Sequence, residues 1–101
     1  MNDSTTPEVQ SHHVPAVAPP HRLQYEEAQE SWVLLYPEGM VKLNQSAGEI
    51  LRRCDGERDV AAITALLEKD FEQDNLGTEV TAFLGIALQQ RWVTVNGNPS
   101  T

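Results

Sequence analysis

The stretch WVLLYPEGMVKLNQSAGEIL, residues 32–51, constrains the fold more than any other part of this chain. Its first half is rich in aromatic and β-branched residues, which favour strands. In the PEG triplet, Pro37 is suited to start a turn and Gly39 tolerates a positive φ, so the chain reverses between two strands. The second half places apolar residues at helical spacing. The sequence therefore predicts a β-hairpin followed directly by an amphipathic helix.

A further strand is predicted before the hairpin. RLQYE alternates in polarity, with Leu23 and Tyr25 on one face, and predicts a strand at residues 22–26. SWVLLY, at 31–36, and MVKL, at 40–43, predict the next two strands of an antiparallel meander. The last two strands carry apolar residues on both faces, so we expect part of their surface to meet helices or a partner.

Three short helices are predicted after the strands, each with an apolar stripe at i, i+3, i+4 spacing. The first covers about 45–54 with Asn44 as N-cap, the second about 60–70 with Asp59 as N-cap, and the third about 78–90. The stripe of the second is expected to comprise Val60, Ile63, Leu67 and Phe71. The order predicts an α+β fold of the winged helix-turn-helix type, an N-terminal three-stranded antiparallel sheet followed by a three-helix bundle.

The two ends of the chain differ from the middle. Residues 1–21 carry four of the six prolines and no periodicity, so they bury too little surface to offset their ordering entropy. We expect a flexible Pro-rich tail over 1–21, one folded domain over 22–96 and a frayed C-terminus over 97–101. Within the domain, RWVTV predicts either a short terminal strand or the packing of Trp92 on the core.

The charge of the chain excludes some partner classes. The 101 residues include 7 basic and 15 acidic side chains, a formal net charge of -8. This disfavours nucleic acid and anionic membranes, because phosphate binding needs clustered Lys and Arg. No apolar run approaches the roughly 20 residues that span a bilayer, and the first ten residues show no signal-peptide pattern. The simplest prediction is a cytoplasmic location.

Groups suited to catalysis or metal binding are few. His12, His13 and His21 lie in the N-terminal segment without a Cys or carboxylate cluster at metal-ligand spacing. The predicted domain has no His, which removes the commonest general base. The single cysteine, Cys54, excludes an internal disulfide and lies on an apolar stripe, where packing explains it better than reactivity. We therefore predict no catalysis, no cofactor and no metal.

The run LLYPEGMVKLNQSAGEIL, followed by LEKDF and RWV, resembles the PqqD family of pyrroloquinoline quinone biosynthesis proteins. The similarity covers about Leu23 to Val95 and excludes the N-terminal tail. It implies a non-catalytic peptide chaperone, a recognition element for ribosomally made and modified peptides. The implied partners are the precursor peptide PqqA and the radical SAM enzyme PqqE, which links a Glu and a Tyr side chain of the precursor. The iron–sulfur clusters belong to that enzyme.

The resemblance also implies a binding site. In related domains the leader peptide pairs as an added strand with the third strand of the sheet, beside the third helix, and an open strand edge suits this use. On this chain the implied residues are Met40, Val41, Lys42, Leu43, Phe83, Leu84, Ala87, Leu88 and Arg91. Lys42 and Arg91 are expected to meet acidic groups of the peptide. The helical periodicity leaves open whether Leu84 and Leu88 face the groove or the core.

Other interpretations remain open from the sequence alone. The element order is also that of a nucleic-acid-binding winged helix, although residues 23–95 carry 13 acidic and 6 basic side chains. An acidic protein-interaction module fits this charge better. An unpaired strand edge also allows a strand-mediated homodimer, which would occlude the peptide groove.

Overall fold

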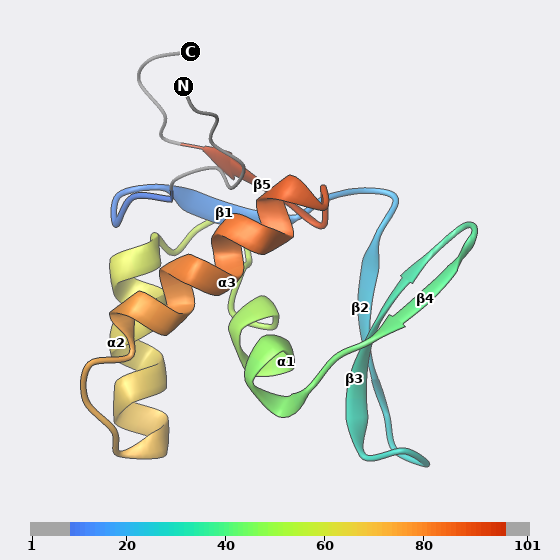
Figure 1. Cartoon of the computed structure of the whole chain (residues 1–101), viewed down its shortest axis with the longest axis horizontal. Coiled ribbons are helices and arrows are strands. Elements are labelled where there is room, and N and C mark those ends of the chain that lie inside the picture. Colours follow the sequence, from blue (N-terminus) through green and yellow to red (C-terminus); the bar gives the residue numbers. More distant parts are fainter. Residues whose placement is uncertain (1–8, 97–101) are drawn as a thin grey trace.

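The computed structural model describes residues 9–96, which form two antiparallel sheets and three helices (Figure 1). The elements in chain order are β1 (Val14–Val17), β2 (Arg22–Glu26), β3 (Ser31–Tyr36), β4 (Gly39–Lys42), α1 (Gln45–Leu51), α2 (Val60–Phe71), α3 (Gly77–Gln89) and β5 (Val93–Asn96). One sheet has the order β2-β3-β4, and the other pairs β1 with β5. The predicted α+β class, with a three-stranded antiparallel sheet before three helices, is therefore confirmed.

The three-stranded sheet presents an apolar row to the helices. Leu34 of β3 lies opposite both Leu23 of β2 and Val41 of β4. Residues directly opposite one another point to the same face, and all three side chains contribute to one hydrophobic core. Val33 points to the other face and is also fully buried. The middle of β3 is thus buried on both faces, in agreement with the expectation that part of this apolar surface is covered.

Both predicted N-caps are present, but the first helix is shorter than expected. The side chains of Asn44 and Asp59 each accept a hydrogen bond of 2.8 Å from the backbone N–H three residues further on. α1 ends at Leu51 and not at Cys54. The N–H of Cys54 bonds to the carbonyl of Leu51, which makes a tight turn in place of a further helical turn.

The N-terminal segment is not a flexible tail where the structure describes it. Val14–Val17 forms β1, paired with β5, and the N–H of Ala18 donates to the carbonyl of Trp92 at 2.8 Å. The expected tail over 1–21 is therefore wrong for residues 9–21, and the terminal-strand option for RWVTV is confirmed. Residues 1–8 and 97–101, which include the expected frayed C-terminus, lie outside the described range.

Residues upstream of β1 also bind the helical layer. The carbonyl of His13 accepts a hydrogen bond of 2.9 Å from the N–H of Val60, and the carbonyl of Ser11 accepts one of 3.1 Å from Ala61. These two N–H groups belong to the first turn of α2, which has no intrahelical acceptors for them. The N-terminal segment thus completes the start of α2, and the side chain of Val9 joins the core.

One hydrophobic core holds the three-stranded sheet, the helices and β5 together. Its buried members are Val9, Leu34, Leu43, Ala47, Ile50, Leu51, Cys54, Val60, Ile63, Leu67, Val80, Leu84, Ala87 and Val93. Phe71, which the helical pattern places in the stripe of α2, is instead 39% exposed. It is the last residue of α2, where the chain leaves the helix through Glu72 in the left-handed conformation (φ 54°).

Close packing between Trp32 and Gly48 docks α1 on the sheet. A Cβ atom added to Gly48 would lie 2.3 Å from Cδ1 of Trp32 and 2.7 Å from its Cβ. Both distances are far below van der Waals contact, so only glycine admits the indole against the helix backbone. The glycine inside SAGEIL therefore serves a packing requirement, which outweighs its unfavourable helix propensity.

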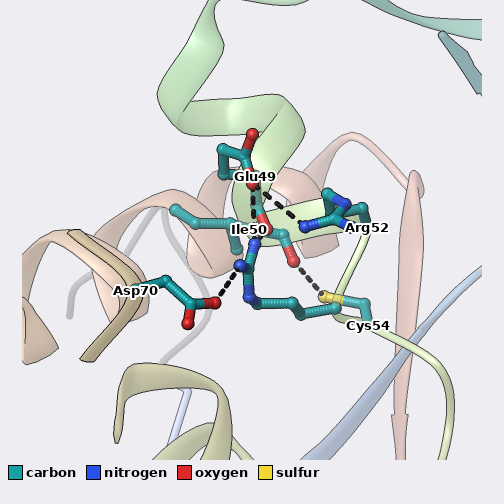
Figure 2. Close-up of polar contacts among 6 residues, drawn as sticks. Glu49, Ile50, Arg52, Cys54 and Asp70 are labelled. Atoms are coloured by element: carbon teal, nitrogen blue, oxygen red, sulfur yellow. Dashed lines mark hydrogen bonds and ion pairs between the residues drawn. The ribbon is translucent and has the colours of Figure 1, made fainter. Parts of the chain in front are cut away.

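A buried arginine ties α1 to α2 (Figure 2). The guanidinium of Arg53 donates to Oε1 of Glu49 at 2.8 Å and to Oδ2 of Asp70 at 2.5 Å, and its residue is only 7% exposed. Burial acts to lower the pKa of Arg53. The hydrogen bonds and charges of the two carboxylates outweigh burial, so this pKa lies above its ordinary value. The charge is therefore retained, and loss of either carboxylate would leave it incompletely paired.

Cys54 is a packing residue in this core. Its thiol is buried, and Sγ donates to the carbonyl of Ile50 at 3.3 Å (Figure 2). Burial, helped by the nearby negative charge of Asp55, raises the pKa of the thiol to about 12. The thiolate is the reactive form of cysteine, so this environment suppresses reactivity, in agreement with the interpretation from the sequence.

The variant Gly48→Ala tests the docking of α1. Alanine favours an isolated helix by about 1 kcal/mol, but overpacking against an indole costs about 1 to 3 kcal/mol. We expect a net loss in the free energy of unfolding, measured by urea denaturation followed by tryptophan fluorescence. Ser46→Ala, on the exposed side of the same helix, is the matched control and should change little. A Gly48→Ala protein as stable as the parent would disprove the packing requirement.

Cys54 should resist alkylation in the folded protein. At about pH 8, iodoacetamide should label the denatured chain quickly and the native chain only as fast as it unfolds. The pKa of the Cys54 thiol is higher in the folded state than in the unfolded state. The protonated thiol therefore contributes its full stabilisation below the unfolded-state pKa of about 8.5, and this stabilisation is lost as pH rises towards the folded-state pKa. The parent should therefore lose stability relative to Cys54→Ala as pH rises across this alkaline range.

Candidate functional site

The outer strand β4 offers an open edge, and its geometry shows which backbone groups are available (Figure 1). The N–H of Leu43 donates to the carbonyl of Trp32 at 3.0 Å, in register with the β3–β4 ladder. Hydrogen-bonded and non-hydrogen-bonded pairs alternate in an antiparallel ladder. Val41 therefore bonds inward to β3, whereas Met40 and Lys42 direct their N–H and C=O groups away from the sheet. The edge presents two donor–acceptor pairs at alternate residues.

The side chains of this edge divide into two faces. Val41 is half-buried and packs on the core, and Leu43 is only 5% exposed. Met40 and Lys42 point to the opposite face, and Met40 is 51% exposed. The residues with outward backbone groups are thus the same ones whose side chains are accessible. An added strand would meet the backbone groups of both and the side chains of Met40 and Lys42 beside them.

The structure places the predicted residues of α3 at different depths. Leu84 and Ala87 are fully buried, which settles that Leu84 faces the core. Phe83 and Leu88 are half-buried and border the core, and Arg91 is exposed, just beyond the end of the helix. Of the predicted α3 residues, Phe83, Leu88 and Arg91 are therefore accessible, while Leu84 and Ala87 pack behind them.

The edge of β4 and the accessible residues of α3 do not form one tightly packed unit. α3 packs mainly on α2 and β5, whereas the sheet packs on α1 through β3. In Figure 1, β4 diverges from the helices towards its turn, and α3 crosses the helical layer on the other side of α1. The two parts are connected through the core, which Val41, Phe83 and Leu88 all border. Of the nine predicted residues, six are accessible and three, Leu43, Leu84 and Ala87, are buried.

Some accessible apolar groups were not predicted from the sequence. Ile86 of α3 is 47% exposed and Tyr25 of β2 is 46% exposed. The excess apolar residues of α3 were a signal for Ile86, because a single buried stripe does not account for them. Tyr25 was assigned to the apolar face of β2, and only the structure shows that its ring extends beyond the core at the end of the sheet.

Several ionisable groups have structural partners. Asp55 accepts hydrogen bonds from the backbone N–H groups of Glu57 and Arg58, and these bonds are the main reason why its pKa lies below the ordinary value. They stabilise the turn before α2. Within residues 9–96, no group of three or more His, Cys, Asp or Glu side chains is arranged to hold a metal ion. In the same range, no helix has the length and apolar character needed to cross a bilayer.

Comparison with known proteins identifies close relatives. A PqqA binding protein from Klebsiella pneumoniae (strain 342) is 56% identical over 75 residues, which cover 73% of this chain and 82% of that protein. A PqqA binding protein from Pseudomonas fluorescens (strain Pf0-1) is 51% identical over 83 residues, which cover 81% of this chain and 91% of that protein.

A solved structure and a family model agree with these relatives. The solution NMR structure of the PqqD truncation of Methylobacterium extorquens PqqCD is described as a functional, stand-alone recognition element for ribosomally synthesized and post-translationally modified peptides. It superposes with a TM-score of 0.73 at 25% identity, covering 85% of this chain and 94% of that one. The family model for coenzyme PQQ synthesis protein D (PqqD) matches residues 31–93. The chain therefore belongs to the PqqD family.

Proposed function

We propose that this protein is a non-catalytic chaperone that binds a PqqA-type precursor peptide as an added strand on β4. It then presents the peptide to the radical SAM enzyme PqqE. Relatives that are about half identical to this chain are PqqA binding proteins, and the similar solved domain is a peptide recognition element. The observation that carries the binding mode is the outward direction of the backbone groups of Met40 and Lys42.

The edge alone supplies only part of the affinity. The outward N–H and C=O groups of Met40 and Lys42 allow up to four backbone hydrogen bonds, each contributing about 0.5 to 1.5 kcal/mol net. Association costs at least about 4 kcal/mol in lost freedom. Side-chain contacts must therefore add to the backbone contacts. Met40, Phe83 and Leu88 offer the accessible apolar surface for this, and they would select apolar side chains of the peptide.

Charge also selects the peptide at this edge. Lys42 is the only basic residue between Arg22 and Arg52, and its side chain is exposed on the edge strand. We propose that Lys42 and Arg91 pair with acidic side chains of the precursor. The net charge of -8 disfavours binding to nucleic acid or to an anionic membrane, so neither is proposed as a partner.

The same edge also allows a homodimer by strand pairing, in competition with the peptide. A peptide that saturates the edge would then shift the protein towards monomer. We place the protein in the cytoplasm, where precursor peptides are synthesised, consistent with the exposed charge of the surface and the single buried thiol.

Proline substitution at the edge tests strand addition. Lys42→Pro removes an outward N–H and leaves the bonds of Val41 to β3 in place. We expect about tenfold weaker binding of the precursor peptide in calorimetric titration, the equivalent of one backbone hydrogen bond and some steric loss. Lys42→Ala keeps the N–H and is the control for loss of charge.

Val41→Pro completes this set, because it removes an inward N–H and should destabilise the hairpin itself. Circular dichroism and amide spectra of Lys42→Pro must match those of the parent for its binding result to count. A folded Lys42→Pro protein that binds the peptide as tightly as Lys42→Ala would rule out pairing at this edge.

Amide hydrogen exchange gives an independent prediction with the unmodified protein. The N–H groups of Met40 and Lys42 should exchange quickly in the free protein, whereas those of Val41 and Leu43 should be protected by β3. Saturating peptide should slow exchange at Met40 and Lys42 selectively. Protection that appears on β2 and not on β4 would place the peptide at the other edge of the sheet.

A further inference from the structure

A cavity lies where the β2–β3 turn meets the start of α1. Its volume is about 260 Å³. Its lining comprises Tyr25, Glu30, Ser31, Trp32, Gln45 and Glu49. These six residues are all different from the nine that the family resemblance implies for peptide binding.

Two aromatic rings form one wall of this cavity. Tyr25 and Trp32 are direct cross-strand partners, with ring centroids 5.2 Å apart and ring planes at 67°. The guanidinium carbon of Arg52 lies 5.9 Å from the Trp32 centroid, within the range of a cation–π contact. The indole surface therefore already attracts a cation of the protein itself, and the exposed ring of Tyr25 offers a second aromatic face beside it.

The other walls are acidic and polar. Glu49 shares its carboxylate with Arg52 and Arg53, but Glu30 takes part in none of the ion pairs within residues 9–96. Glu27 lies in the same turn, and Glu26 ends β2 just before it. Glu30 is therefore the carboxylate of this cavity that is available to a further cation.

The hydroxyl of Ser31 does not face the two rings, because Ser31 directly precedes Trp32 and side chains alternate between the faces of β3. Oγ of Ser31 is buried and has no hydrogen-bond partner among the described residues. An ammonium or guanidinium group in the cavity would instead donate hydrogen bonds to the carboxylate of Glu30.

We propose that this cavity binds a lysine or arginine side chain of the precursor peptide. The proposal rests on the proposed function, because a peptide paired with β4 passes close to the cavity. Trp32 pairs with Leu43 directly after β4, and Gln45 opens α1 beside it. An added strand would lie two interstrand spacings, about 10 Å, from β3. The peptide's basic side chain and the indole of Trp32 together span that distance.

A small probe tests the site without the peptide. The indole N–H signal of Trp32 is followed by NMR during titration with N-acetyl-lysine methylamide. The uncharged control probe is N-acetyl-norleucine methylamide. We expect a saturable shift for Trp32 with the lysine probe alone, and none for Trp92, which lies next to β5 at the other sheet. No shift of Trp32 with the lysine probe would overturn the proposal.

Matched variants assign the cation to its acidic partner. Glu30→Gln should weaken binding of the lysine probe about threefold, the scale of an exposed ion pair. Glu38→Gln makes the same charge change in the β3–β4 turn and should leave binding unchanged. An equal effect of both variants would show only a general loss of negative charge, and would overturn the assignment to this cavity.

The precursor peptide then tests the source of the cation. Its lysine and arginine residues are replaced one at a time by norleucine, and one replacement should weaken binding to the parent but not to Glu30→Gln. If the probe binds and no replacement has this effect, the cation comes from another partner and the proposal is wrong for the peptide. If the peptide binds normally and the probe does not, the cavity proposal fails while the proposed function stands. Absence of peptide binding altogether would refute both.

Discussion

Contact between the indole of Trp32 and the backbone of Gly48 is the constraint on which the rest of the structure depends. The sheet buries one row of apolar side chains, and α1 is the helix that packs on its central strand. The absence of a side chain at Gly48 lets the helix approach closely enough for the core to close. Arg53 then ties the end of α1 to α2 through Asp70, so the sheet, α1 and α2 are positioned in sequence. An edge strand keeps a fixed position only if the strands behind it are anchored in this way.

The exposed edge of β4 is supported by the rigid sheet behind it, and its residues limit self-association. A protein that binds an extended peptide by strand addition must leave backbone groups unpaired, which is a liability for aggregation. In this chain the unpaired stretch is short, and it carries Lys42, a residue type that natural edges use against self-association. The high negative charge of the whole chain adds a repulsion between copies. In the proposed binding mode, selectivity for a peptide over a second copy would follow from charge as well as from shape.

Much of the fold could be predicted from the sequence, because the sequence patterns that indicate it involve neighbouring residues. Alternation in β2, the turn after Tyr36 and the caps Asn44 and Asp59 each involve neighbouring residues, and each was confirmed. The pairing of β1 with β5 joins residues about 80 positions apart, such as Val14 and Asn96, and no local pattern reports it. A proline-rich composition correctly indicates little apolar surface, but it says nothing of backbone groups that a distant strand can satisfy. Burial on α3 was ambiguous for a related reason: periodicity shows that one side is apolar, not how deeply Leu84 or Ile86 lies.

The pairing of β1 with β5 has a consequence for how this domain combines with others. Val14 and Asn96 lie opposite one another in the small sheet, away from β4 (Figure 1), and the described chain ends there at Asn96. A protein joined after Asn96 would be attached at that sheet and not at the edge of β4. The C-terminal connection and the edge proposed for peptide binding therefore lie at different places on the fold, so a partner fused after Asn96 would start away from that edge.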